Sequence, residues 1–153
     1  MRKVFAGLAA LLMLVIVLQF FLAASGAFDS APNEEAFRPH RALGYMSVLL
    51  ALVLTVVAAA IRLPGRIVGR CGALVGLAIL QPVIAVIARG LGDSDTSTTA
   101  GQLVFGLHAV NGLMIMAVNR TVLQEARVLA GPASATGAGA GDGAPRPGSA
   151  PAS

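Results

Sequence analysis

The sequence predicts an all-α protein, a four-helix transmembrane bundle that runs up-down-up-down with both termini inside the cell. Three observations predict it. Only 12% of the 153 residues are charged and 56% are hydrophobic, whereas about 25% of a soluble domain is charged. Four apolar runs approach the roughly 20 residues that span a bilayer. The basic residues gather at alternate ends of these runs, which is typical of a multi-pass membrane protein and not of a nucleic-acid-binding protein.

One transmembrane domain is expected over residues 1–130. Its helices are predicted at about 4–24, 40–61, 67–89 and 101–120. Arg2 and Lys3 precede the first helix and place its start inside. A signal peptide is the competing interpretation, because Ser25-Gly26-Ala27 resembles a cleavage site. The apolar run is longer than the ~7–15 residues of a signal-peptide core, so a retained helix is favoured.

The second and third helices are separated by a basic turn. An acidic loop over 28–38 leads into the second helix, and Pro39 suits a first helical turn. Arginines 62, 66 and 70 then place the next turn inside. In the third helix, Gly72 and Gly76 have a spacing that favours close helix contact, and Gln81-Pro82 predicts a kink.

The fourth helix follows an outer loop at 90–100, whose Ser, Thr and Asp residues suit a helix cap. It is expected to end near Asn119-Arg120. Residues 131–153 are nearly all Gly, Ala, Pro and Ser, which predicts a disordered cytoplasmic tail. The chain has no clear internal repeat, although two helical hairpins are compatible with a distant one.

Each predicted helix carries a polar side chain at a similar depth in the outer half. These residues are Gln19, Ser47, Gln81, His108 and Asn111. A polar atom facing lipid would lack a hydrogen-bond partner, so we expect them inside the bundle. Two interpretations stay open: hydrogen bonds that join the helices, or a binding site. The inner half has few polar groups, which argues against a channel or transporter.

Haem is the cofactor that this layer suggests. Imidazole is a standard axial ligand of haem iron, and the chain has two histidines, His40 and His108. Together they would hold one b-type haem, with Arg38 and Arg41 on its propionates and Tyr45 as a further hydrogen-bond donor. His40 stands at the head of its helix and His108 several residues into its own. The expected offset is therefore roughly 9 Å, part of which helix tilt absorbs.

Two segments carry a resemblance to known families. Residues 37–45 (FRPHRALGY) and 102–112 (QLVFGLHAVNG) resemble a family of small bacterial four-helix membrane proteins of unknown function. The pair His40-Arg41, with a histidine in a later helix, is more distantly similar to the four-helix haem-binding halves of haem A synthase. That similarity implies His40 and His108 as the ligand pair. Phe37 replaces the glutamate of that enzyme, and its second bundle is missing, so the similarity implies haem binding and not haem A synthesis.

Enzyme motifs are not evident in the sequence. It has no phosphate-binding glycine loop and no Ser/His/Asp set, and we read the single Cys71 as a packing residue. The alternative to a haem protein is a non-catalytic accessory or scaffold subunit, whose polar layer only specifies helix packing. In either case the expected surroundings are the lipid bilayer of the cytoplasmic membrane and a redox or host-complex partner within it.

Overall fold

The four long helices are present in the computed structural model, which describes residues 1–92 and 98–131. They are α1 (Arg2–Ala27), α3 (Arg38–Ala60), α4 (Gly65–Gly90) and α5 (Thr99–Ala130), and α2 (Asn33–Ala36) is a single turn. The described ranges contain helices and no strand. All four long helices are long and apolar enough to cross a membrane. The predicted all-α class with four helices long and apolar enough to span a membrane is confirmed, and the chain is a multi-pass membrane protein.

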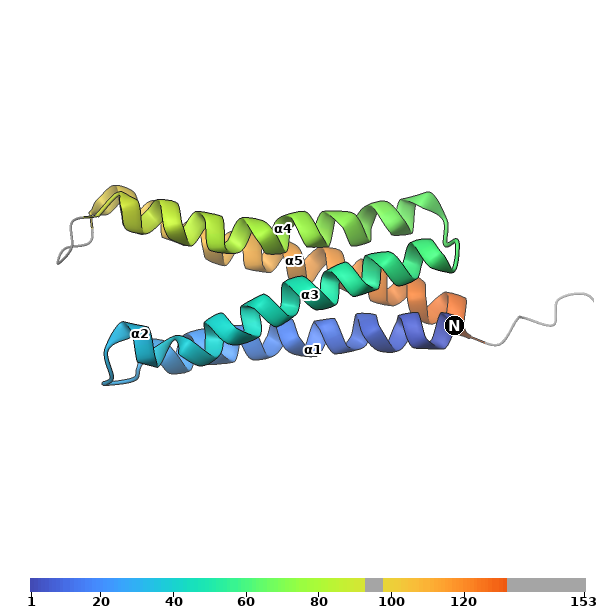
Figure 1. The fold of residues 1–153 in the computed structure, drawn as a ribbon, viewed down its shortest axis with the longest axis horizontal. Coiled ribbons are helices and arrows are strands. Elements are labelled where there is room, and N and C mark those ends of the chain that lie inside the picture. The colour runs from blue at the N-terminus through green and yellow to red at the C-terminus, as the bar shows by residue number, and fades with distance from the viewer. Residues whose placement is uncertain (93–97, 132–153) are drawn as a thin grey trace, which may run out of the picture.

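The helices form two hairpins that pack side by side (Figure 1). The first consists of α1 and α3, and the second of α4 and α5. Between the hairpins, α1 packs against α5 and α3 packs against α4. The described backbones of α3 and α5 do not pack against each other. α3 and α5 therefore lie diagonally across the bundle, and residues of these two helices meet only through side chains that reach its centre.

The hydrophobic core lies in the half of the bundle that holds the N-terminus and the turn between α3 and α4, which we call the inner half after the predicted topology and the opposite half the outer half. α1 contributes Phe5, Ala9, Leu12 and Ile16, whose spacing of three and four residues puts them on one helix face. The other helices add Ala51, Leu54, Ala58, Ile67, Cys71, Leu74, Ile115, Val122, Leu123 and Ala126. Cys71 is buried in this core, as expected of a packing residue.

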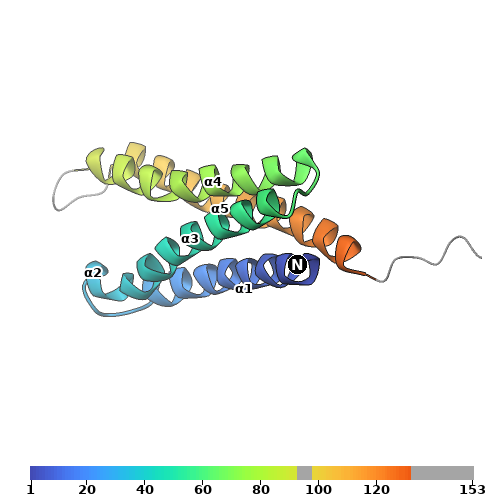
Figure 2. The same cartoon turned by 45° about the vertical axis from the view of Figure 1, so that its right-hand side comes forward.

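The outer half is built differently. Figures 1 and 2 both show the two hairpins diverging toward the end that carries α2. Between Arg38 and Leu50, α3 has no buried residue, although its inner half has three. Large apolar side chains are exposed all along the bundle, as expected for helices that face lipid. The hairpins are therefore joined by the inner core and separate above it.

The third helix differs from the sequence prediction in its glycines. A Cβ atom built at Gly72 or Gly76 would meet nothing within 4 Å. Both residues are exposed, so the predicted close helix contact at this pair is wrong. α4 also continues as one helix through Pro82.

The last helix is longer than predicted. α5 continues to Ala130, ten residues past the expected end at 120. Val122, Leu123 and Ala126 are buried against the inner core, and this packing stabilises the extra turns. Apart from Gly131, the predicted tail lies outside the described residues, as does the 93–97 part of the outer loop.

Candidate functional site

The two histidines lie close together at the centre of the outer half. His40 comes from α3 and His108 from α5, and their ring centroids are 6.1 Å apart with the ring planes tilted by 55°. The depth offset expected from the sequence is small in the structure. Figure 1 shows why: α4 and α5 extend beyond the start of α3 at this end. The nine residues of α5 that precede His108 therefore bring it to the level of the first turn of α3.

Each imidazole is held by a backbone carbonyl of the preceding helix. His40 Nδ1 lies 3.1 Å from the carbonyl oxygen of Gln19, and His108 Nδ1 lies 3.2 Å from that of Gln81. A carbonyl oxygen only accepts hydrogen bonds, so Nδ1 must carry the proton in both rings. In the neutral imidazole this leaves the lone pair on Nε2, the nitrogen through which such a ring binds a metal.

Aromatic rings flank both histidines. Phe105, one turn before His108, stacks on its ring with a centroid distance of 5.3 Å and an interplanar angle of 6°. Phe37 meets the His40 ring edge-on at 6.4 Å and 84°. Such contacts contribute about 0.5–1.5 kcal/mol each between aromatic side chains. Together with the Nδ1 bonds, they restrict the rotation of the rings.

The same arrangement occurs in both hairpins. The side-chain Nε2 of Gln19 lies 3.1 Å from a Cβ atom built at Gly44, and that of Gln81 lies 3.2 Å from one at Gly112. Each glycine follows its histidine by four residues, so it lies one turn further along on the same helix face. The absence of a side chain there leaves room for the glutamine amide. Each hairpin thus supplies one histidine, one glutamine and one glycine.

The other residues of the predicted layer are used in different ways. Asn111 is buried and donates from Nδ2 to the carbonyl of Leu77 at 2.8 Å, which joins α5 to α4. Ser47 Oγ donates to the carbonyl of Gly44 at 2.7 Å, a bond within α3. Ser47 therefore does not join helices as the sequence predicted.

The residues expected around the edge of a cofactor are not gathered at the histidines. Tyr45 is 68% exposed, and its position five residues after His40 puts it on another face of α3. Arg41 donates to the backbone carbonyl of Glu34, which ties α3 to α2. Arg38 is exposed at the start of α3.

Sequence reasoning missed two interior polar residues of α5. Asn119 is fully buried and donates from Nδ2 to the carbonyl of Ala9 at 3.1 Å. Glu125 pairs with Arg70 and Arg66 of α4. The signal for Asn119 was its spacing: it lies eight residues after Asn111, and therefore on the same helix face.

The described part of the chain holds five buried side-chain oxygens without a hydrogen-bond partner. They belong to Gln19, Gln81, Asn111, Asn119 and Glu125. All five are acceptors, and a buried acceptor without a donor costs free energy. No group of three or more His, Cys, Asp or Glu residues that could hold a metal ion occurs in the described ranges.

Part of the chain is similar to a family without an assigned activity. Residues 19–89 match the model of a family of unknown function (DUF6220). The match begins at Gln19, contains His40 and Gln81, and ends before α5, so it does not include His108. No curated protein and no solved structure matches the chain.

Proposed function

We propose that His40 and His108 bind one b-type haem in the outer half of the bundle. The observation that supports this is the 6.1 Å distance between the two ring centroids. Two imidazoles that bind one metal ion from opposite sides, each through a nitrogen about 2 Å away, have centroids about 6 Å apart. The rings come from diagonal helices, so each approaches from its own hairpin.

The protein's own groups suit this role. The carbonyl oxygens of Gln19 and Gln81 fix the tautomer of each ring through Nδ1, and a hydrogen bond of this kind also raises the basicity of the ligating nitrogen. Asn111 fixes α5 to α4 one turn below His108. The ring of His108 is further aligned by Phe105.

The hairpins diverge at the end of the bundle that carries the two histidines (Figure 1), and a haem held by His40 and His108 would lie between them. α3 buries no side chain between Arg38 and Leu50, whereas α4 buries Ile84 one turn beyond Gln81. Of the two arginines beside His40, Arg38 is exposed at the start of α3 and would be the one available to a propionate, because Arg41 already binds the Glu34 carbonyl. A bound haem supplies one-electron chemistry, which suits electron transfer or haem handling with a redox or host-complex partner in the membrane.

The test is the visible absorption spectrum of the detergent-purified protein, oxidised and reduced with dithionite, after expression with ample haem. We expect a sharp reduced α-band that is lost in His40→Ala and in His108→Ala. Ser47→Ala is the matched control, because Ser47 lies two turns after His40 in α3 and its hydroxyl bonds only within that helix. It should keep the band. A colourless wild-type protein, or a band that survives both histidine substitutions, would contradict haem binding by this pair.

The second candidate is a non-catalytic accessory or scaffold subunit. It is favoured by the bonds of the layer, since His40, His108 and Asn111 each bind a backbone carbonyl of a neighbouring helix. Such bonds join membrane helices with about 0.6 kcal/mol each. A colourless protein whose histidine variants unfold at lower temperature would support this function.

A further inference from the structure

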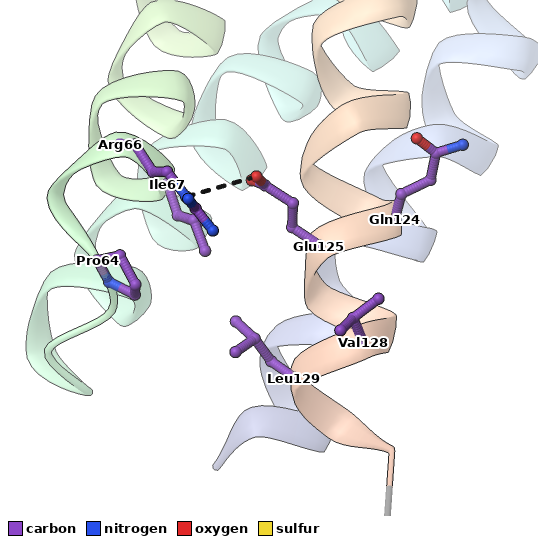
Figure 3. Close-up of a pocket in the computed structure, with 7 residues that line it drawn as sticks. All are labelled: Pro64, Arg66, Ile67, Gln124, Glu125, Val128 and Leu129. Carbon is purple, nitrogen blue, oxygen red and sulfur yellow. Dashed lines mark ion pairs between the residues drawn. The ribbon is translucent and has the colours of Figure 1, made fainter. Parts of the chain in front are cut away.

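A cavity lies at the inner end of the bundle, at the opposite end from the histidines. It is formed between the start of α4 and the last turns of α5 and has a volume of about 230 Å³. Its lining residues are Pro64, Arg66, Ile67, Gln124, Glu125, Val128 and Leu129. Figure 3 shows Arg66 and Glu125 reaching toward each other across its top, with Pro64 and Ile67 on the α4 side and Leu129 on the α5 side.

The charges around the cavity do not balance. Glu125 Oε1 lies 2.5 Å from Nη1 of Arg70 and 3.7 Å from Nε of Arg66. One carboxylate thus faces two guanidinium groups. Because the contact with Arg70 is the shorter one, the carboxylate mainly neutralises the charge of Arg70. The side chain of Arg66 is also the more exposed of the two, at 72% against 40% for Arg70. A positive charge on Arg66 is therefore left at the mouth of the cavity.

Below this charge the cavity wall is apolar. Pro64 before α4, Ile67 of α4 and Leu129 of α5 offer no hydrogen bond to a small hydrated anion. The residues lie at the ends of two membrane-spanning helices, which is the level at which lipid phosphates meet acyl chains. Basic pockets between helices at this level bind anionic headgroups. A phospholipid has an anionic headgroup for Arg66 and an acyl chain for the apolar wall, whereas a soluble anion can bind only the arginine.

We infer that this cavity binds one anionic phospholipid, with the phosphate on Arg66 and the start of an acyl chain against Ile67 and Leu129. Glu125 does not repel the phosphate, because Arg70 compensates its charge. The inference is independent of the proposed haem site, which lies in the other half of the bundle.

The test counts phospholipids bound to the delipidated, detergent-purified protein by native mass spectrometry. The probes are phosphatidylglycerol and phosphatidylcholine with the same acyl chains. We expect one phosphatidylglycerol to bind in preference to phosphatidylcholine, and Arg66→Gln to weaken it by about fivefold, the worth of one arginine near a membrane surface. Arg66→Lys should keep most of the binding. Arg127→Gln is the control. Arg127 is exposed at the same end of the bundle and is not part of the cavity lining, so its replacement should leave the binding unchanged.

Three results would overturn the inference. Both lipids carry a phosphate, so equal binding of the two would show that the net negative charge of the headgroup is not recognised. Equal weakening by Arg66→Gln and Arg127→Gln would show attraction to the whole basic face and not to this cavity. Displacement of phosphatidylglycerol by millimolar inorganic phosphate would assign the site to a soluble anion. Thermal unfolding of each variant without lipid shows whether it is folded. We expect the Arg66→Gln protein to be folded, because Arg70 still pairs with Glu125 in it.

Discussion

At the scale of single residues, the glycines show where helices need to approach closely. A Cβ atom at Gly112 would lie 3.2 Å from Gln81 Nε2 and 3.2 Å from Cζ of Phe20, two side chains that arrive from α4 and α1. Gly106, in the same helix, has nothing within 4 Å. The sequence named the histidines through their residue type. It did not predict which glycines matter, because a glycine carries no side chain that indicates what lies against it.

The two glycines should respond in opposite directions to the same substitution. Gly112→Ala overpacks the layer and is expected to destabilise the protein by about 1–3 kcal/mol. Gly106→Ala faces open space within a helix and is expected to stabilise it by about 0.5–1 kcal/mol. Reversible unfolding in mixed detergent measures both. Equal effects of the two substitutions would mean that Gly112 is not a point of close packing.

At the scale of helices, the sequence predicted best what depends on the composition of one segment alone. The four spans follow from their apolar length, and the histidines of α3 and α5 from their rarity in such spans. What depends on a second helix was missed. The extra turns of α5 exist because Val122 and Ala126 pack on the inner core, and the carbonyls that hold the imidazoles belong to backbone, which carries no residue-specific signal.

The ion pair between α4 and α5 gives a prediction at this scale. Arg70→Gln should lower the unfolding temperature more than Arg66→Gln, since Arg70 makes the shorter contact with the partly buried Glu125 and its loss leaves that carboxylate with a weaker partner. Both are compared without added lipid. In the Arg70→Gln protein, Glu125→Gln should restore part of the loss by removing the unpaired charge. Similar unfolding temperatures for the two arginine variants would argue against this division of the charge.

For the whole molecule, the direction of insertion remains a prediction from the basic residues. Arg2, Lys3, Arg62 and the two arginines in the first turns of α4 lie at one end of the bundle, and the acidic residues of α2 at the other. The positive-inside pattern therefore places the histidine layer toward the outer face and the cavity with Arg66 toward the cytoplasm.

Cysteine labelling in intact cells tests this orientation. In a Cys71→Ala background, Ser30→Cys in the loop before α2 should react with a membrane-impermeant maleimide added outside. Gly131→Cys, at the end of α5, should react only after the cells are permeabilised. Both positions are exposed, so differences in burial do not account for a difference in labelling. The reverse pattern would invert the topology.

The matching histidine, glutamine and glycine of the two hairpins have a consequence for ancestry. Both hairpins begin and end at the same end of the bundle (Figure 1), which is the arrangement that a twofold axis along the membrane normal would produce. Two copies of a single two-helix chain, paired around that axis, would already place two imidazoles face to face. A symmetric homodimer of half this length is thus the simplest ancestor of the site. Fusion of its two copies would then have left Asn111 and Asn119 of α5 free to diverge from their counterparts in α3.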